Sequence, residues 1–165
     1  MRTVELTLDT ALEREVRAVW QQLQAAGLPS LATHAHPTNR PHVTLAAAAD
    51  LTTGVSTALA ALPLPAHLNG LMVFEGRSGV LVWRVVADES LRALQARVWS
   101  ALDGQERNPL HAPERWVPHV SLALRIRPDD RARASAVLAH LRAARGQFVG
   151  ARSYHHETRD VLHLA

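Results

Sequence analysis

Two copies of one short motif carry the residues of this chain that are best suited to chemistry. Residues 41–46 read Pro-His-Val-Thr-Leu-Ala, and residues 118–123, 77 positions later, read Pro-His-Val-Ser-Leu-Ala. Successive side chains of a strand point to opposite faces, so each histidine shares a face with the hydroxyl residue two positions on. The pairs His42 with Thr44 and His119 with Ser121 are therefore predicted to face one cleft.

Two imidazoles and two hydroxyls suit the cleavage of a phosphodiester. The reaction removes a proton from the attacking oxygen and delivers one to the leaving oxygen, and histidine titrates nearest neutrality, so one neutral ring can act as base and one protonated ring as acid. The hydroxyls of Thr44 and Ser121 can donate to phosphate oxygens without a metal. We predict His42 and His119 as the catalytic residues; the alternative is a pair of hydrogen-bonded core histidines.

Two arginines are candidates for contact with the substrate phosphate. Arg40 shares strand parity with His42, and Arg125 shares it with His119 and Ser121 if the strand stays regular that far. With 18 arginines in the chain and no lysine, a solvated surface role is the alternative for both. Trp116 and Tyr154 are candidates for stacking on a nucleobase, with core packing as the alternative.

The remaining histidines raise the question of a metal site. They include His34, His36, His111 and the pair His155-His156. No cysteine exists in the chain, and no carboxylate stands at a ligand spacing beside these residues, so no metal site is predicted. We expect these histidines to line loops around the groove.

Composition limits the class of protein. A chain of 165 residues that is 47% hydrophobic and 20% charged can bury one core. The absence of cysteine excludes disulfides and a cysteine nucleophile. The net charge of +3 is mild, although nine arginines against five carboxylates in residues 111–165 would favour an anionic ligand. No run resembles a signal peptide or a membrane span, so a cytoplasmic location is expected. The sequence gives no oligomeric signal, and a monomer is assumed.

Alternation and helical spacing predict the elements that position the motifs. Strands are expected near 3–8, 41–47, 66–75, 79–87, 147–152 and 160–164 and at the second motif, and helices over 10–26, 52–62, 89–102 and 128–145. Residues 76–78 are expected to form a hairpin turn. The order predicts an α+β fold: residues 1–165 form a single domain with two pseudo-symmetric lobes, whose two antiparallel sheets face a central groove with helices outside.

The two motifs resemble those of the 2H phosphoesterases, and within them the 2′-5′ RNA ligase-like or cyclic phosphodiesterase branch. Residues 79–83, Gly-Val-Leu-Val-Trp, and 91–95, Leu-Arg-Ala-Leu-Gln, are similar to the strand and helix that lead into the second motif of the family. The resemblance covers roughly residues 3–164. It implies a bilobal fold with a pseudo-twofold axis, chemistry without metal or cofactor, and substrates with a 2′,3′-cyclic phosphate or a 2′-5′ linkage.

The reaction implied by this resemblance is the opening of a 2′,3′-cyclic phosphate by water, which expels the 3′ oxygen and leaves a 2′-phosphate. His119 would be the base and His42 the acid, and Thr44 and Ser121 would hold the non-bridging oxygens. The substrates would be RNA 3′ ends or small cyclic nucleotides, and neither a membrane nor a protein partner is indicated.

The chain also departs from the family pattern. Members often have an arginine soon after the hydroxyl residue, but the first motif runs into the alanines 46–49, and the second offers only Arg125. This departure favours small nucleotides over RNA. Two alternatives stay open: a non-catalytic module that binds nucleotides or RNA ends, and an enzyme that acts on 2′-5′ linkages or on an ADP-ribose cyclic phosphate.

Overall fold

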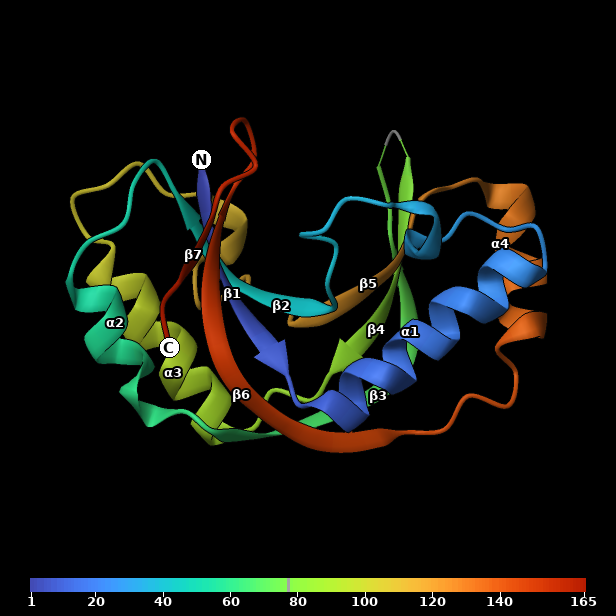
Figure 1. Ribbon diagram of the computed structural model, residues 1–165, viewed down its shortest axis with the longest axis horizontal. Helices are drawn as coiled ribbons and strands as arrows, with labels where there is room; N and C mark the ends of the chain where they lie inside the picture. The colour runs from blue at the N-terminus through green and yellow to red at the C-terminus, as the bar shows by residue number, and fades with distance from the viewer. Residues whose placement is uncertain (77) are drawn as a thin grey trace.

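The computed structural model describes residues 1–76 and 78–165 (Figure 1). The strands are β1 (Arg2–Leu8), β2 (His42–Ala48), β3 (Leu64–Phe74), β4 (Gly79–Val85), β5 (His119–Ile126), β6 (Ala144–His155) and β7 (Val161–His163). The helices are α1 (Thr10–Ala25), α2 (Gly54–Ala58), α3 (Glu89–Ala101) and α4 (Pro128–Val137). None of the helices in the described part of the chain is both long and apolar enough to span a bilayer.

The strands form a continuous antiparallel sheet with two limbs. Its order is β2-β1-β6-β3-β4-β5, with β7 added to β6. The long strands β3 and β6 pair with each other in the middle of the sheet. On one side β3 also pairs with β4, and on the other side β6 also pairs with β1. Figure 1 shows the limbs rising on either side, with the helices outside them. The predicted α+β class is confirmed, and the two predicted sheets are the limbs of this continuous sheet.

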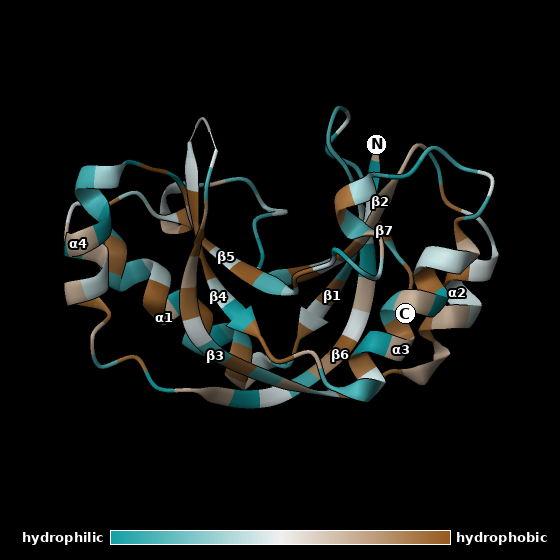
Figure 2. Cartoon of the chain, turned by 180° about the vertical axis from the view of Figure 1, so that it is seen from behind, coloured by the Kyte–Doolittle hydropathy of each residue, from teal (hydrophilic) through white to brown (hydrophobic). Residues whose placement is uncertain are grey.

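Each limb is covered by helices from both halves of the sequence. Helix α1 contacts β5, and α3 contacts β2. In Figure 1, α1 and α4 accordingly lie beside β3, β4 and β5, whereas α2 and α3 lie beside β1, β2 and β7. Apolar residues recur along the helices and strands of both limbs, as Figure 2 shows, and the buried residues form one hydrophobic cluster. The single-domain assignment stays a proposal, which this shared core supports.

The two motif strands have the same register against their neighbours. His42 lies opposite Thr7 of β1, and His119 lies opposite Arg84 of β4. Thr7 and Arg84 are 77 positions apart, as the two histidines are. The internal duplication seen in the motifs therefore extends to the adjoining strands.

Each motif strand also has a β-bulge at the leucine of the motif. The pairing of β1 with β2 shifts so that Leu45 has no opposite residue, and the pairing of β4 with β5 shifts in the same way at Leu122. An extra residue reverses the alternation of side chains that follow it. Leu45 with Ala46, and Leu122 with Ala123, are accordingly consecutive residues that are fully buried.

The structure corrects several predicted boundaries. The helix expected over 128–145 ends at Val137, because residues from Ala144 onward belong to β6, where Ala144 pairs with Leu68 of β3. The helix expected over 52–62 is the short α2 followed by a 3-10 turn at 59–61. The hairpin turn predicted at 76–78 contains Arg77, which lies outside the described residues, but β3 and β4 do pair antiparallel.

Candidate active site

The two motif histidines open their strands and are held in the same way. His42 Nδ1 lies 2.7 Å from the carbonyl oxygen of Arg40, and His119 Nδ1 lies 2.7 Å from that of Val117. A carbonyl oxygen can only accept a hydrogen bond, so Nδ1 carries the proton in both rings. Nε2 of each ring is thereby left to exchange protons with a substrate.

Two cavities lie beside these rings. The His42 cavity, of about 270 Å³, is lined by Glu5, His34, His36, Thr38, Asn39, Arg40, His42, Leu124, Arg152, Tyr154 and His156. The His119 cavity, of about 230 Å³, is lined by Thr44, Phe74, Leu110, His111, Arg115, Trp116, Val117 and His119. The residues of the first lining are mostly polar or charged, whereas half of those of the second are apolar, among them Phe74 and Trp116.

Strands β2 and β5 each contribute to both cavities. Thr44 of β2 lines the His119 cavity, and Leu124 of β5 lines the His42 cavity, so both motif strands contribute to both cavities. Strands β2 and β5 are in contact, and a positive charge on His42 lowers the pKa of His119. The rings are therefore within electrostatic reach of each other.

His119 lies in an environment that favours its neutral form. Burial is the largest cause that lowers its pKa; the hydrogen bond to the Val117 carbonyl raises it, and the charge of His42 lowers it further. The ring of Phe74 meets the imidazole edge to face, with 4.7 Å between centroids. His111 lines the same cavity, and burial and then the charge of His119 lower its pKa as well. A neutral His119 at pH 7 has the state that a general base needs.

His42 has a different neighbour. Glu5 Oε1 lies 3.6 Å from His42 Nε2, and this carboxylate is almost completely buried. Its other oxygen accepts a hydrogen bond from Arg152 Nε at 2.8 Å. Neither Glu5 nor Arg152 was predicted as a site residue, because they lie on strands β1 and β6, whose pairing beside β2 has no local signal in the sequence.

Two buried indoles support the backbone of the motif strands. Trp20 Nε1 on α1 donates to the carbonyl of Ser121 at 3.0 Å, and Trp116 Nε1 donates to the carbonyl of Thr44 at 2.9 Å. Strands β2 and β5 end the strand order, so each has one backbone edge without a neighbouring strand. The indoles supply donors at these edges, one in each half of the molecule.

We expect Trp20→Phe and Trp116→Phe each to lower the free energy of unfolding by about 1–3 kcal/mol more than Trp83→Phe does. Trp83 is equally buried, but its Nε1 has no hydrogen-bond partner among the described residues, so its replacement removes the same volume without leaving a carbonyl unpaired. Urea unfolding of the three variants measures the difference. Equal losses in all three would show that these hydrogen bonds contribute nothing to stability.

The predicted phosphate contacts have different positions. Arg40 lines the His42 cavity, but its Nε forms an ion pair with Glu13 Oε2 at 2.7 Å. Arg125 is exposed and has a positive φ of 57°; the prediction for it assumed a regular strand, and the bulge at Leu122 removes that condition. Leu124 lines the cavity instead. Of the predicted hydroxyl pair, Thr44 lines the His119 cavity, whereas Ser121 of β5 is half-buried and is not among the lining residues of either cavity.

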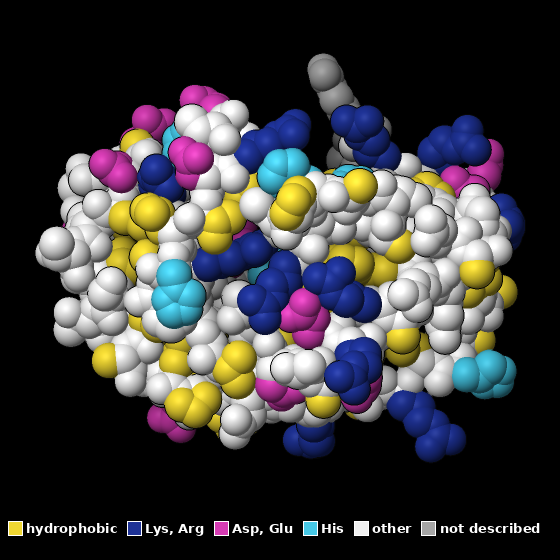
Figure 3. Space-filling view, viewed as in Figure 1, with side chains coloured by type: hydrophobic (Ala, Val, Ile, Leu, Met, Phe, Trp, Pro, Cys, Tyr) yellow, Lys and Arg dark blue, Asp and Glu magenta, His cyan; other side chains and the backbone are white. Residues whose placement is uncertain are grey.

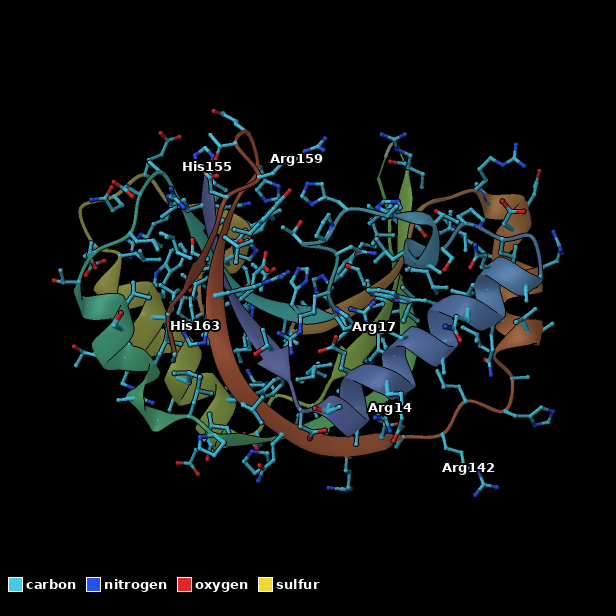
Figure 4. All side chains as sticks on the ribbon, viewed as in Figure 1. Arg14, Arg17, Arg142, His155, Arg159 and His163 are labelled. Carbon is cyan, nitrogen blue, oxygen red and sulfur yellow. The ribbon has the colours of Figure 1, made fainter. Side chains whose placement is uncertain are left out.

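The aromatic and histidine candidates lie around the same groove. Trp116 is 7% exposed and lines the His119 cavity, whereas Tyr154 lines the His42 cavity with His156. His34, His36 and His111 are also lining residues, as expected, but His155 lies at the turn between β6 and β7 (Figure 4). Within residues 1–76 and 78–165, no three potential ligands among histidine, aspartate and glutamate are arranged to hold a metal ion.

Comparison with known proteins places this geometry in a family. The model of the 2′-5′ RNA ligase superfamily matches residues 9–158. The chain belongs to the 2′-5′ RNA ligase superfamily, the 2H phosphoesterases. A similar solved structure is Usb1 of Kluyveromyces marxianus with uridine monophosphate, with a TM-score of 0.56 and 16% identity over 99% of this chain and 96% of that chain. No match was found among curated proteins.

Membership of this superfamily supports a phosphodiesterase that acts on RNA or nucleotides. The likeness to Usb1 extends over almost the whole of both chains and shows a common fold. The resemblance seen in the two motifs is thus confirmed for the family.

Proposed function

We propose that this protein is a metal-independent phosphodiesterase that opens the 2′,3′-cyclic phosphate of nucleotides or RNA 3′ ends and leaves a 2′-phosphate. The observation that carries the proposal is the equivalent setting of the two imidazoles. Both Nδ1 atoms are hydrogen-bonded to a backbone carbonyl, and each ring lines a cavity to which both motif strands contribute. Acid and base catalysis at one phosphorus atom needs such a pair.

In the proposed reaction, His119 is the base and His42 the acid. Nε2 of neutral His119 takes a proton from water as the water oxygen bonds to phosphorus. The bond between phosphorus and O3′ then breaks, and Nε2 of protonated His42 delivers its proton to O3′. The lowered pKa of His119 supports its role as base. Thr44 and Ser121 donate hydrogen bonds to the non-bridging oxygens.

The unequal linings of the two cavities support an orientation for the nucleotide. Phe74, Trp116 and Val117 make the His119 cavity suitable for a nucleobase, since apolar and aromatic surfaces stack on bases. Tyr154 offers a second stacking surface in the His42 cavity. The solved Usb1 structure contains uridine monophosphate, so a nucleotide of this size is a reasonable ligand to test. The expected cytoplasmic location and monomeric state stay predictions.

Product analysis by phosphorus NMR tests the proposal. We expect the protein, in the presence of a chelator, to convert 2′,3′-cyclic nucleotides to 2′-monophosphates, with the 3′-monophosphate as the product that contradicts the assigned leaving group. An ADP-ribose cyclic phosphate and a 2′-5′-linked dinucleotide belong in the same panel. Binding of a nucleotide without any product would instead favour the non-catalytic module.

A further inference from the structure

A buried ion pair lines the His42 cavity, and the sequence motifs do not account for it. Arg152 of β6 and Glu5 of β1 are joined by the hydrogen bond from Nε to Oε2 at 2.8 Å. Their side chains are only 10% and 3% exposed, yet both line the cavity that holds His42. The small part of the Arg152 and Glu5 side chains that remains exposed therefore faces the cavity, where a ligand would contact it.

Further hydrogen bonds fix the pair in position. Thr3 Oγ1 donates to Glu5 Oε1 at 2.6 Å, and Arg152 Nη1 donates to the carbonyl of Thr38 at 3.0 Å. A guanidinium has five N–H donors, and the protein acceptors found in the described residues use two of them. Arg152 is thus held rigidly while most of its donors stay available.

The other half of the molecule shows that the strand register does not need this pair. Glu5 lies opposite Thr44 and Arg152, and the residue in the equivalent position, Val82, lies opposite Ser121 and Met72. The second limb therefore builds the same three-strand arrangement from apolar side chains. A buried ion pair adds little stability over apolar residues of similar size. The pair occurs at the His42 cavity and not at the equivalent position of the other limb, which points to a ligand in the His42 cavity.

The charges near His42 leave Arg152 as the cation that is best placed for an anion. Arg40 lines the same cavity, but it is 44% exposed in its side chain and paired with Glu13. Figure 3, viewed from the same side as Figure 1, shows several basic side chains gathered in the middle of that face of the molecule. Glu5 neutralises one positive charge, so Arg152, Glu5 and a protonated His42 together carry one positive charge, which matches a singly charged phosphodiester.

We propose that Arg152 binds an anionic oxygen of the substrate phosphate and that Glu5 is the positioning residue that holds it beside His42. This inference rests on the proposed function, because it assigns the anion in the His42 cavity to the reacting phosphate. Arg152 takes the place of the arginine that family members often have after the hydroxyl residue. It reaches the site from a strand that is remote in sequence.

Calorimetric titration with uridine 2′-monophosphate and with inorganic phosphate tests the inference without turnover. We expect Arg152→Met, which introduces the residue of the equivalent position, to weaken binding of both probes by about 10- to 100-fold. In turnover of a 2′,3′-cyclic nucleotide, the same variant should raise KM more than it lowers kcat. Arg145→Met is the matched control, because Arg145 is an exposed arginine on the same strand.

Arg152→Met leaves Glu5 buried without its partner, so a second variant separates folding from binding. Glu5→Gln/Arg152→Met removes both charges; its melting temperature should recover toward that of the wild-type protein while the loss of phosphate binding persists. Unchanged affinity for both probes in the double variant would overturn the inference. If the wild-type protein binds phosphate through Arg152 but hydrolyses no cyclic phosphate, the proposed function fails and the anion site stands.

Discussion

Alanine in place of His42 or His119 is expected to lower kcat for a 2′,3′-cyclic nucleotide by about 10²- to 10⁴-fold. Each variant removes the ring that performs one of the two proton transfers, while the remaining ring stays held by its own Nδ1 hydrogen bond. Melting temperatures should stay close to that of the wild-type protein, because both side chains are partly exposed.

The pH dependence of kcat/KM separates the two roles. The wild-type protein should show a bell-shaped profile, in which the rate rises with pH as His119 loses its proton. Because burial lowers the pKa of His119, this rise should have its midpoint below pH 6.5. The residual activity of His119→Ala should lose the acid limb, and that of His42→Ala should lose the basic limb.

An exposed histidine away from the groove provides the control. His140, which follows α4, is exposed, and His140→Ala should leave both kcat and the pH profile unchanged. Near-normal turnover in both single variants at His42 and His119 would remove the basis of the proposed mechanism. Exchange of the two limbs between the variants would keep the mechanism but reverse the acid and the base.

Local patterns sufficed to predict the motif strands and their faces. Alternation placed His42 and Thr44 on one face, and helical spacing predicted the helices over 10–26 and 89–102. In the structure, Asp9 accepts a hydrogen bond from Leu12 N, and Asp88 accepts one from Leu91 N. These features depend on residues within four positions of one another, so a single sequence contains them.

The residues that the sequence did not reveal depend on contacts between distant strands. Glu5 and Arg152 are 147 positions apart and meet only because β6 pairs with β1. Nothing near either residue indicates this pairing. The bulge at Leu122 had no local signal either. An uninterrupted alternation would have brought Arg125 into the groove, whereas the bulge brings Leu124 there.

The end of α4 illustrates the same limit for secondary structure. Residues 138–145 contain alanine, leucine and arginine, which favour helix, and no breaker precedes Gly146. The chain nevertheless leaves the helix after Val137, because Ala144 must pair with Leu68 at the junction of the two limbs. Tertiary pairing thus overrides local propensity where the limbs are joined.

This junction is the basis of the second large effect that we expect. Phe148 of β6 is fully buried and lies opposite Leu8 of β1 and Leu64 of β3, so it connects the strands of the two limbs. Phe148→Ala should lower the free energy of unfolding by about 3–5 kcal/mol, since it removes a large side chain and leaves a cavity. Urea unfolding measures this loss, which is a large part of the roughly 5–15 kcal/mol that stabilises a typical domain.

Two further variants establish whether the junction itself is responsible. Val149→Ala, one position away and 47% exposed, should change stability by no more than about 0.5 kcal/mol. Leu68→Ala, on β3 opposite Ala144 and fully buried, should cost about 2–5 kcal/mol. Because the junction sets the position of β2 relative to β5, we also expect both core variants to lose catalytic activity at urea concentrations that leave the wild-type protein active. A Phe148→Ala protein as stable as Val149→Ala would mean that the two limbs are held together by other contacts, and the shared core would then not explain how the two histidines are kept at one groove.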